Sequence, residues 1–363
     1  MLTTLLVFLL VLSVLVYVHE FGHYFAARRN GVRVHEFAFG FRPRLFARKV
    51  GHTEFAVNAI PLGGYVRLHG EQPTETGADS FRSKSIFQRF QILVAGALMN
   101  LILAWVVLSG LFMTGFDPLM PGIASNPFIS STQQVSVVRS LPNSPAAGAD
   151  LIEGDQIKQV NGQAVATDQE FVALVSKEKG KVVRLLIERD GVERTVELLA
   201  RANPPTGEGA LGVAIRSSGE VRSTIVAAPA AALYETGRII GLSAKGVVDF
   251  GKNLIMRGKV SEDVTGLIGI GALTGVTRRL GLEYLLQLVA VVSIGLGVIN
   301  LFPILPLDGG HIAALLYEKV RGRPLTERQL GGFATVGLAL VFALFIIVTY
   351  KDLVRFQVFE RLF

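Results

Sequence analysis

The sequence predicts a polytopic α-helical membrane protein with an α+β domain inserted between its membrane helices. Half of the 363 residues are apolar and the mean hydropathy is +0.46, which favours a membrane protein over a soluble chain of this size. Four segments are almost continuously apolar and carry little or no charge, and the stretch between the second and third segments instead alternates turn residues with short strand-like runs.

The four apolar segments each have about the 20 residues that an α-helix needs to cross a bilayer. The first has no basic residue before Arg28 and no small-residue cleavage site after it, so we expect a retained membrane helix and not a signal peptide. The four segments are residues 2–25, 92–116, 285–305 and 331–350.

The distribution of charge predicts how the helices are oriented. Residues 28–89 carry eleven Lys and Arg against five Asp and Glu, whereas residues 117–222 carry eleven against thirteen. Cytoplasmic loops are enriched in Lys and Arg, so we expect the first region inside the cell and the second region and the N-terminus outside. The basic residues flank apolar segments and do not form one soluble face, so we expect no nucleic-acid partner.

The inserted stretch has the signals of a compact α+β domain. Asn161-Gly162 and Asp190-Gly191 are dipeptides typical of two-residue hairpin turns. The predicted strands cover residues 135–138, 157–160, 181–188, 193–199 and 209–215, and a helix is predicted over 168–176.

Two further regions flank the membrane segments. Residues 31–69 alternate in places, which predicts a sheet or re-entrant hairpin beside the first helix. Residues 224–257 fit either a helix on the outer membrane surface or one packed on the inserted domain. The Gly-rich run 264–275 is too short to span and is expected to be an apolar loop. The predicted divisions are a membrane core over 1–116, an inserted domain over 117–222, a helix and loop over 223–280, and a second membrane core over 281–363.

The segment His19-Glu20-Phe21-Gly22-His23 at the end of the first apolar segment has the pattern H-E-x-x-H. Residues four apart project from one face of a helix, so His19 and His23 can hold one metal ion. Zinc suits this pattern, and Glu20 can act as a base toward a water on the metal. The alternative is a helix end with interfacial polar residues, but ionisable groups in a membrane helix are costly and favour a function.

A catalytic zinc site needs a third protein ligand, and the chain has no cysteine. We predict Asp308, in the run NLFPILPLDGGH over residues 300–311, because the first and third apolar segments run in the same direction and end at the same membrane face. The alternative role for Asp308 is to cap the following helix. The other histidines are His35, His52, His69 and His311.

The combination of H-E-F-G-H with N-x-x-P-x-x-x-L-D-G-G resembles the site-2 protease family of intramembrane zinc metalloproteases, peptidase family M50. The run EGDQIKQVNG in the inserted domain resembles a bacterial PDZ domain, although Ala149-Asp150 departs from the usual pair before the next Leu. This arrangement is similar to the regulator-of-sigma-E protease branch with a single PDZ domain. The runs over 59–68 and 95–100 match that branch too, whereas Ala97 stands where many relatives have Pro.

The resemblance implies one Zn²⁺ per chain, held by His19, His23 and Asp308, with Glu20 as the catalytic residue. It implies cleavage in or beside the transmembrane helix of a single-span substrate, such as an anti-sigma factor or a remnant signal peptide. The protein would lie in the bilayer of a bacterial inner membrane, with its active site near the cytoplasmic face. The PDZ domain would bind exposed C-termini of shortened substrates, or would only space or gate the membrane core.

Five more residues are candidates for contact with substrate. Asn300 matches a family residue implied to hold substrate, and its alternative role is a polar cap on a broken helix. Asn100 matches the end of the second-helix motif, and its alternative role is hydrogen bonding between helices. We expect strand addition of an unwound substrate near Gly63, Gly64 and Tyr65.

Two other classes of protein remain open. A PDZ-bearing membrane scaffold would have an inactive metal site, and the intact H-E-x-x-H pattern and Asp308 disfavour it. A metal transporter would use the same ligands but would be expected to have more ionisable residues in its spans and internal repeats.

Overall fold

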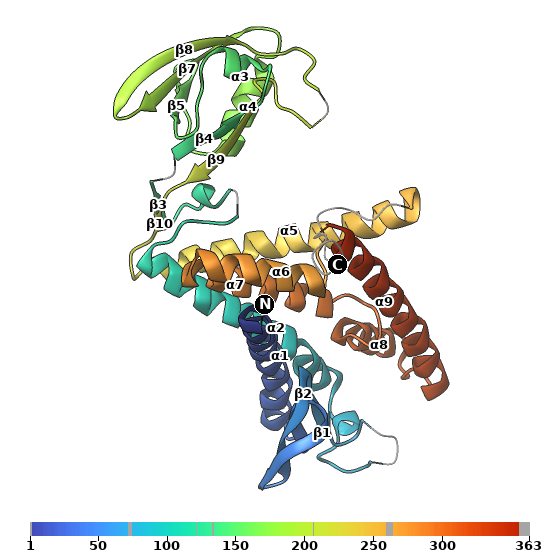
Figure 1. Cartoon of the computed structure of the whole chain (residues 1–363). Helices are drawn as coiled ribbons and strands as arrows, with labels where there is room; N and C mark the ends of the chain where they lie inside the picture. Colours follow the sequence, from blue (N-terminus) through green and yellow to red (C-terminus); the bar gives the residue numbers. More distant parts are fainter. Residues whose placement is uncertain are drawn as a thin grey trace. The chain divides into compact units, whose positions relative to one another are not determined.

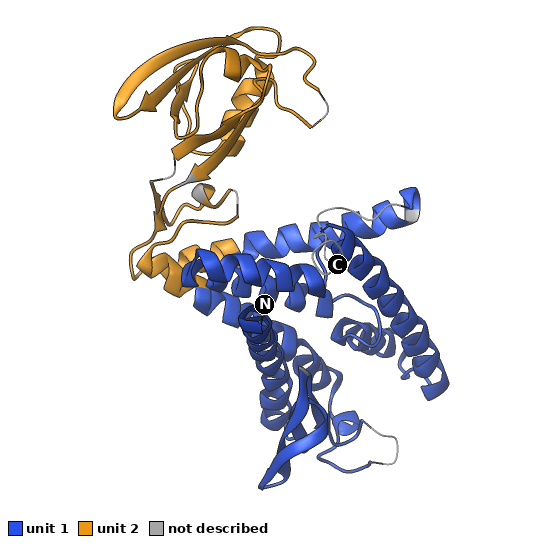
Figure 2. Ribbon diagram, in the orientation of Figure 1, with its two compact units in different colours: residues 1–107, 236–363 blue, residues 108–235 orange. Residues whose placement is uncertain are grey.

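A computed structural model describes residues 2–71, 75–120, 122–132, 134–205, 207–258 and 264–355. The chain forms two compact units (Figures 1 and 2). One unit comprises residues 1–107 with 236–363, and the other comprises residues 108–235.

Four helices are long and apolar enough to cross a membrane, as the sequence predicts. The most apolar windows of the first and fourth are only 11% and 6% buried inside the protein, which leaves their side chains free to contact lipid. The four helices are α1 (Leu2–Arg29), α2 (Ile86–Thr114), α7 (Leu282–Asn300) and α9 (Glu327–Arg355).

Small residues bring α1, α2 and α7 close together. A Cβ at Gly22 of α1 would overlap the backbone oxygen of Ala95 in α2, and one at Gly297 of α7 would lie 3.1 Å from the backbone oxygen of Ala97. The Ser293 hydroxyl of α7 donates to the backbone carbonyl of Asn100 at 2.8 Å. Close backbone approach and hydrogen bonds between helices are the main sources of helix association in lipid. This packing fixes α2 against the helix that carries the H-E-x-x-H pattern.

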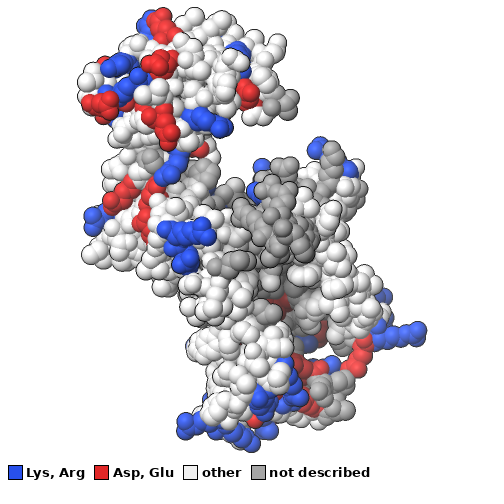
Figure 3. All heavy atoms as spheres, viewed as in Figure 1, with Lys and Arg blue, Asp and Glu red and all other residues white. Residues whose placement is uncertain are grey.

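A curled antiparallel sheet lies beside α1 (Figure 1) and confirms the predicted strands. It consists of β1 (Val34–Val50) and β2 (Thr53–Leu68). Part of β1 has partners in two separate stretches of β2, so that Phe39 faces both Gly64 and Val57. Lys and Arg side chains gather at the end of the first unit that carries this sheet (Figure 3). A basic surface is what the positive-inside rule expects of a cytoplasmic region.

The first unit contains three more helices among its described residues. They are α5 (Ala228–Arg257), which begins in the second unit, α6 (Leu267–Leu280) and α8 (Asp308–Arg321). A short 3₁₀ turn, η1 (Phe81–Ser83), precedes α2. The helix expected over 224–257 is therefore present as α5. Whether it lies on the outer membrane surface or packs on the inserted domain stays a prediction.

The prediction of an apolar loop over residues 264–275 is wrong, because residues 267–275 form the first part of α6. Glycine within a helix costs about 1 kcal/mol relative to alanine, and this cost favoured a loop. Packing outweighs it here, because a Cβ at Gly275 would lie 3.0 Å from Thr4 Cγ2 of α1. The buried Asp352 carboxylate of α9 also accepts hydrogen bonds from the backbone N–H groups of Gly266 and Gly269, at 2.9 and 2.8 Å. These bonds satisfy the first turn of α6.

The second unit contains a six-stranded antiparallel sheet in the order β8-β7-β5-β4-β9, with β6 paired to β5. Asn161 and Gly162 have φ of 50° and 81°, as a type I′ hairpin turn requires, and Asp190 and Gly191 have 53° and 76°. The strands are β4 (Gln134–Ser140), β5 (Gln156–Val160), β6 (Gln163–Ala164), β7 (Val182–Arg189), β8 (Val192–Leu199) and β9 (Val213–Ser218).

Two helices accompany the sheet, α3 (Pro145–Gly148) and α4 (Asp168–Lys177). Thr167 and Glu170 form a capping box at the start of α4. Phe171 of α4 belongs to the buried cluster that includes Ile157 and Leu185 of the sheet. This architecture confirms the predicted α+β domain of PDZ type. Outside it lie a 3₁₀ turn, η2 (Ile123–Ser125), and a two-stranded ladder of β3 (Ser130–Ser131) and β10 (Val221–Arg222).

Candidate metal centre and active site

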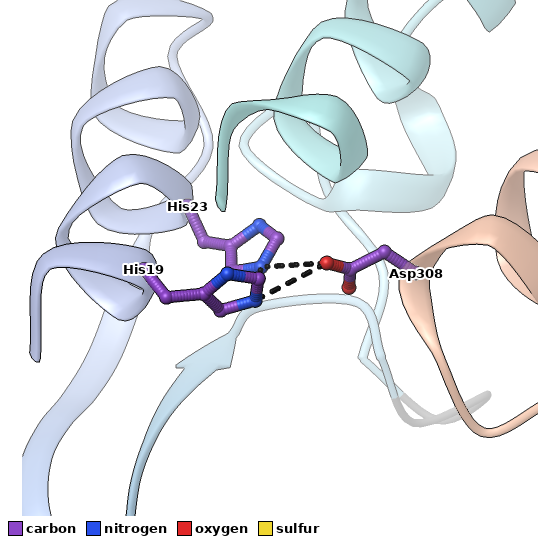
Figure 4. Close-up of side chains that lie close together, drawn as sticks. All are labelled: His19, His23 and Asp308. Atoms are coloured by element: carbon purple, nitrogen blue, oxygen red, sulfur yellow. Dashed lines mark hydrogen bonds and ion pairs between the residues drawn. The ribbon is translucent and has the colours of Figure 1, made fainter. Parts of the chain in front are cut away.

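Three side chains from two helices meet at one point in the first unit (Figure 4). His19 and His23 lie one turn apart on α1, and their Nε2 atoms are 3.2 Å apart. Asp308 is the first residue of α8, and its Oδ2 lies 3.2 Å from His19 Nε2 and 3.4 Å from His23 Nε2. The structure therefore brings Asp308 to the two histidines although it lies 285 positions after His23 in the sequence.

These three atoms are spaced as zinc ligands would be. With bonds of about 2.0–2.1 Å, a tetrahedral zinc site places its ligand atoms about 3.3 Å from one another. The three observed distances lie within about 0.2 Å of that value. Asp308 Oδ2 is also buried and finds no hydrogen-bond donor among the described residues, as expected of an atom with a cation as its partner. The residues present fit a zinc ion.

The Asp308 side chain does not act as a helix cap. The N-cap of α8 is Leu307, which makes no side-chain capping bond, and Asp308 points to the two histidines. Burial alone would raise the pKa of Asp308, but His19 and His23 in their protonated form would outweigh burial and hold that pKa below its usual range. A metal ion would take the place of those protons and leave Asp308 as the carboxylate that it requires.

Neighbours on α2 hold the imidazoles in orientation. His23 Nδ1 donates to the backbone carbonyl of Ile92 at 2.8 Å, which leaves its Nε2 lone pair facing the site. Asn100, which is fully buried, has its amide nitrogen 3.4 Å from His19 Nδ1. Its Oδ1 has no partner among the described residues, and turning the amide over would let Oδ1 accept from His19 Nδ1. Asn100 thus lies beside a candidate ligand and also joins α2 to α7 through its backbone.

Gly96 of α2 leaves the space in which the three ligand atoms meet. A Cβ there would lie 2.8 Å from His19 Nε2 and still closer to His23 Nε2. The sequence reasoning missed this residue, although the small residues of the run AGALMN were the available signal. Gly309 and Gly310 are needed in a similar way, because side chains there would overlap the backbone at Leu301 and Leu305.

Glu20 lies between the metal-ligand candidates and β2. It is partly buried and is close enough to His19, His23 and Asp308 to interact with their charges, and its carboxylate also interacts with the backbone of Val66 in β2. This position allows the Glu20 carboxylate to accept a proton from a water molecule beside the metal ligands.

The other candidates differ in how close they lie to Glu20. A Cβ on Gly64 would be 3.4 Å from Glu20 Cγ, so this part of β2 lies directly against Glu20. A Cβ on Gly63 would meet the ring of Phe41, and the Tyr65 hydroxyl donates to Glu36 at 3.0 Å, away from the histidines. Asn300 is the partly buried last residue of α7, and none of its described hydrogen bonds reaches the three ligand candidates.

Comparison with known families gives a match to peptidase family M50 over residues 7–344. The chain belongs to this family. The resemblance predicted from the H-E-F-G-H and L-D-G-G motifs is confirmed, and so is the prediction of a peptidase.

Sequence similarity to two M50 relatives covers nearly the whole length of this chain. A protein of Mesorhizobium japonicum is 35% identical over 381 residues, which cover 96% of this chain and 98% of that protein. The zinc metalloprotease RasP of Shouchella clausii is 30% identical over 434 residues, with the same coverage of 96% and 98%. Among solved structures, the PDZ domain of an SdrC-like protein from Listeria innocua is 26% identical, with a TM-score of 0.21, and covers 23% of this chain and 92% of that one.

Proposed function

We propose that the protein is a zinc-dependent intramembrane endopeptidase of a bacterial inner membrane, which hydrolyses a peptide bond in the transmembrane segment of a single-span protein. The position of the site within α1 carries this proposal. His19 precedes Arg28, the first basic residue of the chain, by nine residues, or about 13 Å of helix. A hydrolytic site at that depth suits a substrate that is itself in the membrane.

The chain supplies each group that hydrolysis requires. His19, His23 and Asp308 would hold zinc, which when bound acts as a Lewis acid and makes water nucleophilic near neutral pH. Glu20 takes a proton from the attacking water and delivers it to the nitrogen of the leaving amine. The Ile92 carbonyl and Asn100 keep the imidazoles in orientation while the proton moves.

The sheet would present the scissile bond to these groups. A transmembrane helix hides its backbone carbonyls in hydrogen bonds, so it must unwind locally before a hydrolase can reach it. An unwound segment can add to β2 as an extended strand, and Gly64 would let that strand pass close to Glu20. A Cβ at Gly64 would also lie 2.9 Å from the backbone oxygen of Ala38, so the glycine serves the pairing of β1 with β2 as well.

The family resemblance implies the substrate class, and the charge distribution suggests only the orientation in the membrane. The basic residues of 28–89 favour a cytoplasmic β1–β2 sheet, with the N-terminus and the PDZ domain outside. Single-span proteins already shortened outside, such as anti-sigma factors or remnant signal peptides, would reach the site from the bilayer, and the PDZ domain would bind their new C-termini. An inactive scaffold is disfavoured, because it would not require His19, His23 and Asp308 to hold their side-chain atoms at the distances of zinc ligands.

Reconstitution tests the proposal. The purified full-length protein is placed in liposomes with a fluorogenic single-span peptide, and cleavage is followed before and after metal chelation. We expect cleavage that stops on chelation and returns with added Zn²⁺, and a Glu20→Gln variant that keeps its zinc but cleaves at least about 100-fold more slowly. Cleavage that persists in Glu20→Gln, or that chelation does not change, would refute the assignment.

A further inference from the structure

A second group of ligand-bearing side chains converges at the β1–β2 sheet, apart from the candidate active site. His35 is the second residue of β1, and His69 directly follows β2. The strand register pairs Val34 with Leu68, and the His69 backbone N–H donates to the Arg33 carbonyl at 2.8 Å. Strand pairing therefore holds the two histidines at the same end of the sheet.

Glu75 completes the group. His35 Nε2 lies 3.1 Å from His69 Nδ1 and 3.6 Å from Glu75 Oε1, and His69 Nδ1 lies 3.8 Å from Glu75 Oε2. The distance between the two histidine nitrogens is close to the spacing of about 3.3 Å between ligands of a tetrahedral zinc ion, and the Glu75 oxygens lie somewhat farther away, within reach of a small adjustment of that side chain. The side chains of His35, His69 and Glu75 are 25%, 14% and 21% exposed, so all three are largely but not fully buried.

Neighbouring groups orient two of the three side chains toward that point. His69 Nε2 lies 3.2 Å from the Thr76 carbonyl and donates to it, which leaves the Nδ1 lone pair for the cluster. The Gly70 backbone N–H donates to Glu75 Oε2 at 2.8 Å. Such contacts around a ligand fix the orientation in which it binds metal.

Another carboxylate lies nearby. Asp79 lies 3.6 Å from His69 Nε2, but its carboxylate is paired with Arg33 at 2.6 Å and is not needed as a ligand.

We propose that His35 Nε2, His69 Nδ1 and the Glu75 carboxylate form a second zinc site. Two imidazole nitrogens and one carboxylate oxygen suit zinc better than magnesium or calcium, which prefer all-oxygen sites. A bound ion would tie residues 75–79 to the sheet whose strand β2 lies against Glu20. This inference does not depend on peptidase activity.

The competing explanation is a plain hydrogen bond, in which His35 Nε2 donates to His69 Nδ1. Zinc counting separates the two explanations. The full-length protein, purified in detergent with a tag that contains no histidine, is stripped by chelation, reloaded with Zn²⁺ and dialysed before its metal content is measured. A His19→Ala/His23→Ala background removes the first site, so that any remaining ion reports on the second.

We expect two zinc ions per wild-type chain, one in the background variant, and none when His69→Gln is added to that background. His52→Gln is the matched control, because His52 is an exposed histidine on the turn between β1 and β2, and it should change no count. A background variant that binds no zinc would overturn the proposal, and so would one that keeps its ion after His69→Gln.

A variant that fails to fold cannot decide the question, so Glu75→Gln provides a second arm. It preserves the shape of the side chain and should weaken zinc binding in the background variant at least tenfold. In the background variant, Co²⁺ in place of Zn²⁺ gives a visible absorption band that reports directly on the ligands, and the band should shift and weaken when Glu75→Gln is added. An unchanged band in a folded Glu75→Gln protein would exclude Glu75 as a ligand.

Discussion

Gly96 of α2 lies directly against His23 of α1, and a Cβ at Gly96 would occupy the space beside the imidazole Nε2. The same Cβ would lie 2.8 Å from His19 Nε2. The backbone of one membrane helix thus forms a wall of the candidate metal centre on another. Only a residue without a side chain leaves room there for an ion and a water molecule.

Gly96→Ala should therefore abolish zinc binding at His19, His23 and Asp308. The added methyl group competes with the ion for space, so the loss should be at least about 100-fold in affinity. Gly110→Ala on the same helix is the control, since its Cβ meets nothing within 4 Å. Zinc content of the purified proteins measures the effect, and a Gly96→Ala protein that retains normal zinc would show that the site is more open than we infer.

Asn100→Ala should weaken zinc binding about 10- to 100-fold, as is typical for loss of a residue that orients a metal ligand. The rate at saturating zinc should fall less than the affinity, because Asn100 holds His19 and does not touch the reacting atoms. Ser293→Ala, which removes only the bond to the Asn100 carbonyl, is the control. Zinc titrations at fixed substrate provide the measurement, and equal effects of both variants would assign Asn100 to helix packing alone.

Gly64→Val should lower kcat/KM at least about tenfold without loss of zinc. The new side chain would lie against Glu20, where we place the extended substrate, and its Cβ would also press on the Ala38 backbone oxygen of β1, so folding of the variant is checked first. Tyr65→Phe removes a hydroxyl that bonds to Glu36 on the other side and should cleave at near the wild-type rate. Cleavage of a single-span peptide in liposomes checks both variants, and normal cleavage by Gly64→Val would argue against strand addition at this point.

Asp155→Asn should destabilise the PDZ domain by about 3 kcal/mol, because it breaks a buried ion pair. Asp155 is fully buried and accepts from Arg189 Nε at 2.7 Å, from Arg189 Nη2 at 2.8 Å and from the Ile152 backbone at 3.0 Å. Asp190→Asn in the exposed hairpin turn is the control. Hydrogen exchange of β5 and β7 in urea measures the difference at pH 7, and equal protection in both variants would contradict the expectation.

The same ion pair predicts a pH dependence. Burial would raise the pKa of Asp155, but the hydrogen bonds from Arg189 and Ile152 outweigh burial and lower it. A lowered folded-state pKa stabilises the domain above the unfolded pKa of about 3.9, and the stabilisation is lost as the pH falls through the folded value. The difference between wild type and Asp155→Asn should therefore shrink below about pH 4, which hydrogen exchange at pH 3 tests. A difference that is undiminished at pH 3 would contradict this sign.

Local sequence signals predicted the four membrane helices and the H-E-x-x-H pattern, because apolar length and helical spacing depend on neighbours in the chain. Asp308 could be predicted as the third ligand because the first and third apolar segments run in the same direction across the membrane. The helical state of 267–280 was not, because it depends on close packing of Gly275 against Thr4 of α1. The role of Gly96 could not be predicted, because it depends on the contact between α1 and α2. The group of His35, His69 and Glu75 could not be predicted either, because it depends on the strand register of β1 and β2.

We propose that His19, His23, Asp308 and Glu20 together cleave a peptide bond within the membrane. The most direct measurement is co-expression of the wild-type protein or Glu20→Gln with a tagged single-span substrate lacking its outer domain, followed by mass-spectrometric mapping of the product ends. We predict product from the wild type alone, with its new end inside the transmembrane segment. Equal product from both proteins, or a cut outside that segment, would contradict the claim.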